Sequence, residues 1–147
     1  MWLKIFAYMF LCANVHSLWE IQIEGKSGGW AHYLPTWRWN VFWRKFLGGK
    51  PLTGYHVLMM IMYQLSFHIP IIFIKWNLGL ELTTQGLFCW YFVMEDFLWF
   101  IWNPNYRFKR FAQRDVEWHR RWFYHLPISY WWGIIGGLTM ILLGGLQ

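Results

Sequence analysis

The sequence predicts an all-α integral membrane protein, a single bundle of four transmembrane helices with an aromatic interfacial loop and a short amphipathic helix. Composition is the first reason, because 57% of the 147 residues are hydrophobic and only 14% are charged. A soluble domain carries about 25% charged residues. The other reasons are four long apolar runs and the concentration of basic residues in two loops.

The apolar runs predict helices at about 3–22, 52–76, 78–102 and 126–146. A run of about 20 apolar residues is long enough to cross a hydrocarbon core of roughly 30 Å. The third run stops at an Asn-Pro pair, which is a helix stop signal. We therefore expect one membrane domain over residues 1–147.

The first run has a second interpretation. Residues 1–17 contain Lys4, a short apolar core and small residues near His16, which is also the pattern of a cleaved signal peptide. Cleavage would send the first basic loop outward, whereas a retained helix keeps it inside. Both interpretations stay open from the sequence.

Two segments between the runs, 24–51 and 104–125, are too polar and too interrupted by Gly and Pro to span a membrane. The first is rich in Trp and Phe, which favour the headgroup region. We expect both segments to lie along the interface, the second with a short amphipathic helix. In the last run, Gly133 and Gly137 form a small-xxx-small pair that allows close helix packing.

The basic residues predict the orientation. Eleven of the 13 Lys and Arg residues lie in the loops 20–54 and 104–125. Four spans put both loops on one side, so the positive-inside rule makes them cytoplasmic and both termini external. The basic residues in question are Lys26, Arg38, Arg44, Lys45, Lys50, Arg107, Lys109, Arg110, Arg114, Arg120 and Arg121.

The predicted partners are membrane lipids, with either a homo-oligomer or a larger membrane complex as the assembled form. The net charge of +6 does not indicate nucleic acid, because the basic residues flank apolar runs and match anionic headgroups. Cys12 and Cys89 lie inside apolar runs, which argues against a disulfide framework or a cysteine zinc site.

The most informative stretch is 90–104, in which Glu95 and Asp96 stand inside aromatic and aliphatic residues. An ionised residue in hydrocarbon costs about 2.5–3.5 kcal/mol on insertion scales, so two in a row need a reason. With the predicted topology, His and acidic residues from several helix ends collect near the same face. They are His16, Glu20, Glu24, His32, His56, Glu95, Asp96, Asp115, Glu117, His119 and His125.

Such a set supports two chemistries. The first is a divalent metal site for zinc, iron or manganese, because imidazoles and carboxylates are the usual ligands of these ions. The pairs His16/Glu20 and Asp115/His119 also have the i,i+4 spacing of one helix face. The predicted metal ligands are Glu20, Glu24, His56, Glu95 and His119.

The second chemistry is acid–base catalysis by Glu95 and Asp96 on a lipid-soluble substrate. Adjacent residues on a helix point about 100° apart, so only one can aim into a common site. We favour Glu95, because Glu81 lies on nearly the same face. The structural alternative is an ion pair of Glu95 with Arg107 or Arg110.

Two resemblances bear on these hypotheses. The motifs resemble a group of small polytopic prokaryotic membrane proteins, which implies a four-helix membrane protein and brings no activity. They are Glu20-Ile-Gln-Ile-Glu24-Gly25, Gly29-Trp30-Ala31, Leu34-Pro35-Thr36-Trp37-Arg38, Met94-Glu95-Asp96-Phe97-Leu98-Trp99-Phe100 and Trp118-His119. The Met94–Phe100 segment also resembles the glutamate-bearing helix of membrane-embedded lycopene cyclases, although Met94 stands where that family has proline.

The sequence thus predicts an integral membrane protein with a His/carboxylate site near the cytoplasmic face. Its first functional hypothesis is a metal-dependent or acid–base enzyme acting on a lipid or isoprenoid. The alternative is a non-catalytic membrane subunit or binding module for a protein partner, a lipid, a pigment or haem. The 24% aromatic content is the observation that favours this alternative.

Overall fold

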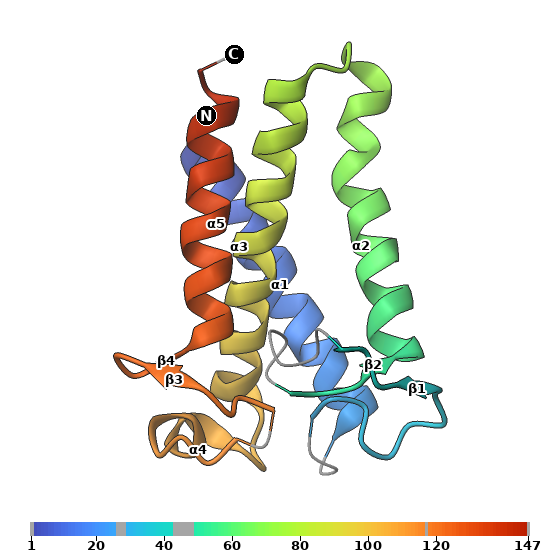
Figure 1. Ribbon diagram of the computed structural model, residues 1–147, viewed down its shortest axis with the longest axis vertical. Helices are drawn as coiled ribbons and strands as arrows, with labels where there is room; N and C mark the ends of the chain where they lie inside the picture. Colours follow the sequence, from blue (N-terminus) through green and yellow to red (C-terminus); the bar gives the residue numbers. More distant parts are fainter. Residues whose placement is uncertain (1, 26–28, 43–48, 117, 147) are drawn as a thin grey trace.

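The computed structural model describes residues 2–25, 29–42, 49–116 and 118–146. Within them the chain forms five helices and two small antiparallel sheets. In order they are α1 (Trp2–Glu24), β1 (Arg38–Trp39), β2 (Leu52–Thr53), α2 (Gly54–Phe73), α3 (Leu78–Trp102), α4 (Arg107–Ala112), β3 (Trp122–Phe123), β4 (Leu126–Pro127) and α5 (Ile128–Gly144). Figure 1 shows α1, α2, α3 and α5 side by side in a bundle, with α4 and both sheets at one end.

The prediction of four transmembrane helices is wrong. Among the helices of the described residues, α2 alone is long and apolar enough to cross a membrane. α5 is apolar but has only 17 residues. α1 and α3 are long enough, but they carry acidic and amide side chains as well as Trp and Tyr. The prediction treated Trp and Tyr as fully apolar, whereas their polar N–H and O–H groups favour the membrane interface.

Side-chain caps fix where two of the helices begin. Thr53 accepts the backbone N–H of His56 at 3.2 Å and starts α2. Asn77 accepts the N–H of Leu80 at 2.8 Å and starts α3. α3 ends at the C-cap Asn103, whose N–H donates to Trp99 at 2.9 Å, and a proline follows. These are the residue types that satisfy the free backbone groups of helix ends.

The central helix of the bundle is α3, which packs most extensively against α5 and next against α1. α2 contacts α3 much less, and Gly54 and Met59 are its buried residues. Most of the apolar surface of α2 is therefore exposed.

Glycines bring α3 and α5 close together. A Cβ on Gly137 would stand 2.6 Å from the Trp90 ring and 2.8 Å from the Gly86 carbonyl oxygen. The Trp90 indole N–H donates to the Ile134 carbonyl at 3.0 Å, which fixes the ring against α5. A Cβ on Gly133 would likewise meet Val93 at 2.5 Å. The small-residue pair of the last helix is thus used in packing.

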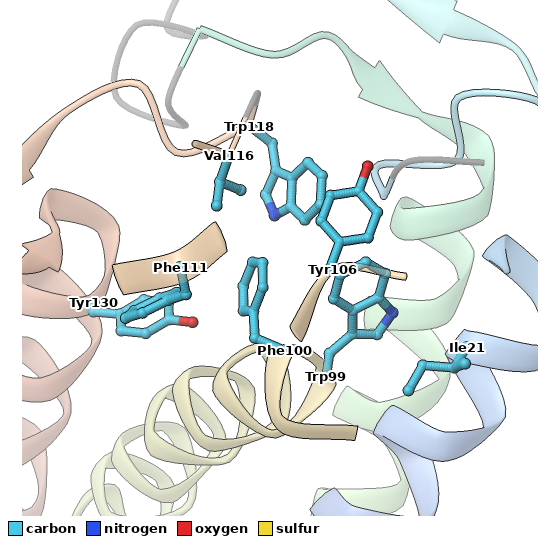
Figure 2. Packing of buried hydrophobic residues seen from close by; sticks show 8 residues of the cluster. All are labelled: Ile21, Trp99, Phe100, Tyr106, Phe111, Val116, Trp118 and Tyr130. Atoms are coloured by element: carbon cyan, nitrogen blue, oxygen red, sulfur yellow. The ribbon is translucent and has the colours of Figure 1, made fainter. Parts of the chain in front are cut away.

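An aromatic core closes the loop end of the bundle. Phe100 stacks on Trp118 with 5.7 Å between ring centroids and contacts Phe111 at 5.1 Å. Figure 2 shows these rings between α3, α4 and the start of α5, with Ile21 of α1 at the edge. The buried members are Ile21, Trp99, Phe100, Tyr106, Phe111, Val116, Trp118 and Tyr130. This core holds the segment after α4 against the helix ends.

We predict that Gly137→Ala destabilises the protein and that Gly136→Ala does not. An added methyl at residue 137 forces backbone or ring shifts that cost roughly 1–3 kcal/mol. A Cβ at Gly136 meets nothing within 4 Å, and alanine favours a helix by up to about 1 kcal/mol over glycine. Unfolding of the purified protein, followed by circular dichroism, measures both changes. Equal effects would contradict the α3–α5 contact.

Candidate functional site

Four acidic side chains come together where α1 and α3 end. The two helices run in the same direction, so that their carboxyl ends lie at the loop end of the bundle (Figure 1). Glu20 and Glu24 belong to the end of α1, and Glu95 and Asp96 to the second half of α3. Glu20, Glu24 and Glu95 are 7%, 5% and 3% exposed. We call these four residues the carboxyl cluster.

Asp96 is the member that carries strong hydrogen-bond partners. His119 Nε2 donates to its Oδ2 at 2.8 Å, and the Tyr130 hydroxyl donates to the same oxygen. Burial alone would raise the pKa of Asp96, but the His119 charge and hydrogen bond, together with Lys50, hold it at about 2. Asp96 is therefore ionised at neutral pH and ties three separate parts of the chain together.

Glu95 points away from Asp96, as adjacent residues on a helix must. Its Oε1 is buried and has no hydrogen-bond partner among the described residues. Burial raises the pKa of Glu95 well above its usual range, and the Glu20 charge adds to the effect. In the same described part of the chain, Trp99 Nε1 and Asn103 Nδ2 are also buried without partners. Trp99 follows Glu95 by about one turn of α3, and Asn103 is the C-cap residue one further turn on.

Among the charged neighbours of Glu95, Glu20 has the largest effect on its pKa. The Tyr55 hydroxyl donates to Glu20 Oε1 at 3.1 Å. Burial and the charge of Glu24 raise the pKa of Glu20 to about 8, although the Tyr55 hydrogen bond opposes them. Glu20 therefore holds a proton at neutral pH and has a half-buried hydroxyl beside it.

Glu24 is held by an unusual backbone turn. Trp30 and Ala31 both have positive φ angles, 65° and 53°, in a region that non-glycine residues enter only at a cost. The turn aims the Ala31 N–H at Glu24 Oε1, where it donates a hydrogen bond. Burial raises the pKa of Glu24 to about 7, and the Ala31 hydrogen bond opposes this shift. Strained backbone of this kind is often part of a functional site.

Lys50 brings a positive charge to the carboxyl cluster. Burial lowers the pKa of Lys50 to about 7, while the charges of Asp96 and Glu24 act in the opposite direction. Its ammonium lies 3.8 Å from the centroid of the Trp30 ring, within the range of a cation–π interaction. Lys50 thus connects the carboxyl cluster with the loop that precedes α2.

Two histidines of the predicted set bind other groups. His56 Nδ1 lies 2.7 Å from Thr53 Oγ1, and its ring stacks on Trp30 at 4.1 Å. His16 lies deeper, with Nε2 3.3 Å from Met59 Sδ and a ring stacked on Tyr63. Hence His56 lies at the edge of the carboxyl cluster and His16 lies in the bundle core.

The structure brings most of the predicted metal ligands into one region. Glu20, Glu24 and Glu95 interact through their charges, and His119 joins them through Asp96. Among the described residues, however, no group of three or more His, Cys, Asp or Glu side chains is arranged to hold a metal ion. Binding of zinc, iron or manganese remains a prediction.

Two local expectations differ from the structure. Arg110 pairs with Asp115 at 3.1 Å, and the Arg107 side chain donates to the backbone of Pro104, so neither arginine pairs with Glu95. The helix α4 ends at Ala112, and the described residues 113–116 and 118 are not helical. The i,i+4 argument for a shared Asp115/His119 face therefore fails.

Glu81, which we expected to share a face with Glu95, binds elsewhere. Its Oε1 lies 3.1 Å from His68 Nε2 and accepts from the Gln85 amide at 2.9 Å, near the start of α3. The Trp76 indole N–H donates to its second oxygen. Glu81 is therefore a separate polar group and not a member of the carboxyl cluster.

Sequence reasoning missed three partners of the carboxyl cluster. Lys50 was used only to predict the orientation in the membrane. It follows a Gly-Gly pair and precedes a proline, a pattern that indicates a tight turn. Tyr55 and Tyr130 stand near the starts of apolar helices, where a buried hydroxyl needs a partner. That rule could have marked both tyrosines, but not their acidic acceptors.

The chain matches no protein-family model, no curated protein and no solved structure. Burial raises the pKa of Glu20 to about 8, that of Glu24 to about 7 and that of Glu95 well above its usual range, whereas the pKa of Asp96 is held at about 2. Such a set can donate a proton and recover it from a neighbour.

We predict that the protein loses stability as the pH rises from 5 to 8, and that Glu20→Gln reduces this loss. The pKa of Glu20 is about 8 in the folded protein and about 4.3 when unfolded. The folded state therefore binds more protons in this window, and deprotonation on raising the pH removes stability. Below about pH 6.5 His16 and His56 act in the opposite direction, because burial lowers their pKa values to about 4 and about 3. Above pH 7 Lys50 does the same, because its pKa is lowered to about 7.

Unfolding free energies at several pH values measure the slope. Asp115→Asn is the control, because Asp115 is an exposed carboxylate outside the carboxyl cluster. Its variant should keep the wild-type slope. A Glu20→Gln variant with the full wild-type slope would rule out a protonated Glu20.

Proposed function

We propose that the protein is a membrane-associated acid–base enzyme, in which Glu95 transfers a proton to a lipid-soluble substrate. The observation that carries this proposal is the Glu95 Oε1 atom, buried and without a hydrogen-bond partner in the described part of the chain. A carboxyl group in such surroundings favours its neutral form, which is the form that can act as a general acid.

The neighbours of Glu95 on α3 fit a polar substrate group. Trp99 Nε1 and the Nδ2 of Asn103, the residue that caps α3, are buried N–H donors four and eight residues after Glu95. Two such donors can bind an oxygen of a substrate while Glu95 supplies the proton. Unsatisfied buried donors carry a free-energy cost, and a bound acceptor would remove it.

Glu20 and Tyr55 provide a route by which the proton returns. When the Glu95 O–H bond breaks and the proton bonds to the substrate, Glu95 becomes a carboxylate. Glu20, whose charge interacts with that of Glu95, holds a proton and can replace it. The Tyr55 hydroxyl then connects Glu20 with more exposed surroundings. Water supplies the proton that restores Glu20, and the protonated substrate becomes neutral again when a carbon-bound proton leaves to the Glu95 carboxylate.

The exposed apolar surface supports a membrane setting. Leu58, Leu65, Ile72 and Phe73 of α2 are 65%, 68%, 78% and 83% exposed. Soluble monomers rarely expose contiguous apolar patches beyond a few hundred Å². Lipid acyl chains around α2 would remove this surface from water and would also bring an apolar substrate to the bundle.

Basic residues at the loop end of the bundle support placing that end at the cytoplasmic membrane surface. Arg107, Arg114 and Arg121 are exposed at the loop end of the bundle, where the carboxyl cluster also lies. Anionic headgroups attract such residues, and the positive-inside rule assigns them to the cytoplasmic face. The reaction would then take place near the cytoplasmic membrane surface.

The same exposed helix supports a second candidate, a non-catalytic membrane subunit. α2 makes few contacts inside the protein. A helix of a partner protein, in place of lipid, could therefore cover Leu65 and Ile72. The native mass of the detergent-extracted protein separates the two. A stable complex with another chain, without chemistry on lipids, would favour the subunit.

We predict that the purified protein incorporates deuterium into carbon positions of an isoprenoid-containing lipid extract in D2O, and that Glu95→Gln does not. A glutamine lacks the transferable proton, and loss of a general acid lowers rates by about 10²–10⁴-fold. Mass spectrometry after back-exchange in H2O detects only deuterium bound to carbon.

Glu81→Gln is the matched control, because Glu81 lies on the same helix but binds His68 outside the carboxyl cluster. This variant should retain the wild-type incorporation. Absence of incorporation by the wild type, or equal incorporation by Glu95→Gln, would overturn the acid–base proposal.

A further inference from the structure

A cavity of about 170 Å³ lies beside the carboxyl cluster, between the loop that precedes α2 and the segment after α4. It is smaller than the roughly 300–1,000 Å³ of pockets for drug-sized ligands, so it suits a small group. The lining side chains are basic or aromatic: Trp30, His32, Arg38, Lys50, Trp118 and Arg120. We propose that this cavity binds a phosphate group.

Three basic side chains give the cavity its charge. None of Arg38, Lys50 and Arg120 forms an ion pair within 4 Å with a carboxylate in the described part of the chain. Arginine binds phosphate through two parallel N–H groups and lysine through a point charge. The cavity thus combines both kinds of phosphate ligand.

Arg38 is held in position by the backbone, and Arg120 lies close to Gly49. Arg38 Nη2 donates to the carbonyl oxygens of Ala31 and His32, the latter at 2.9 Å. A guanidinium has five N–H donors, so others stay available for an anion. Gly49 has φ +85°, and a Cβ there would lie 3.5 Å from the Arg120 guanidinium. The positive φ angle favours glycine at this position, and Arg120 lies within van der Waals range of it.

The aromatic walls are part of the fold. Trp30 donates its indole N–H to the Pro51 carbonyl at 2.9 Å, which fixes the ring beneath the Lys50 ammonium. Trp118 is 5% exposed and belongs to the aromatic core. A Cβ on Gly29 would stand only 2.8 Å from the Trp118 ring. The two loops are therefore packed closely around a built cavity.

Neighbouring charges determine which basic residues of the cavity contribute most to its affinity for phosphate. Lys50 also interacts with Glu24 and Asp96 of the carboxyl cluster, so part of its charge is already balanced. Arg38 and Arg120 supply the remaining attraction. The phosphate can belong to a lipid headgroup at the basic end of the bundle or to a free phosphate compound. The inference goes beyond the proposed proton transfer and does not require Glu95 to react.

The test compares two adjacent arginines. Isothermal titration with inorganic phosphate is carried out on the full-length protein in a zwitterionic detergent. Arg120→Gln should weaken phosphate binding about tenfold or more, because a charge-assisted hydrogen bond is lost. Arg121→Gln removes the same charge outside the cavity and should change the affinity less than about twofold, because salt screens exposed charges.

A second variant and a folding check keep the result interpretable. Arg38→Gln should also weaken binding about tenfold, and circular dichroism verifies that each variant is folded. No saturable phosphate binding by the wild type overturns the proposal. So does an equal loss of affinity in Arg120→Gln and Arg121→Gln, because net charge would then explain it.

Competition distinguishes the two sources of phosphate. Micelles that contain phosphatidic acid displace inorganic phosphate if the site accepts a lipid headgroup, whereas phosphatidylcholine micelles serve as the comparison. Selective displacement by phosphatidic acid supports a headgroup site. Phosphate binding that neither micelle displaces supports a site for a free phosphate compound. Both outcomes retain the phosphate site, and only the source differs.

Discussion

The gathering of four carboxyl groups at the loop end of the bundle, three of them buried and Asp96 33% exposed, is the constraint on which the rest of the structure depends. Glu24 lies in the last turn of α1, where the partial negative charge of the helix end disfavours an acid. Burying an ionised group without a partner costs several kcal/mol. The protein reduces this cost in two ways. The raised pKa values of Glu20 and Glu95 favour their neutral forms, and the ionised Asp96 lies beside His119 and Lys50.

The loops fold around this constraint. Asp96 accepts from His119 and Tyr130, so one carboxylate joins α3, the segment after α4 and the start of α5. Glu24 accepts from Ala31, which lies in a left-handed turn, and the same turn sets Trp30 beneath Lys50. The carboxyl cluster and the basic cavity therefore share Lys50, which interacts with Glu24 and Asp96 and also lines the cavity.

Apolar runs and stop signals predicted where the long helices lie, because helix caps and apolar faces are local properties of the chain. The predicted segment 78–102 coincides with α3. The number of membrane spans was wrong because Trp and Tyr are only partly apolar. His119 was assigned to a helix, whereas it reaches Asp96 from an irregular segment. Contacts such as Lys50 with Glu24 depend on how distant loops pack, which spacing along the chain does not encode.

Glu95 is proposed to be a neutral carboxyl group at pH 7, and infrared spectroscopy detects this protonation state through its C=O band. The wild type should show the C=O band of protonated carboxyls at this pH. Glu95→Gln should remove part of the band, whereas Asp96→Asn should leave it unchanged because Asp96 is already ionised. An undiminished band in Glu95→Gln would contradict the account.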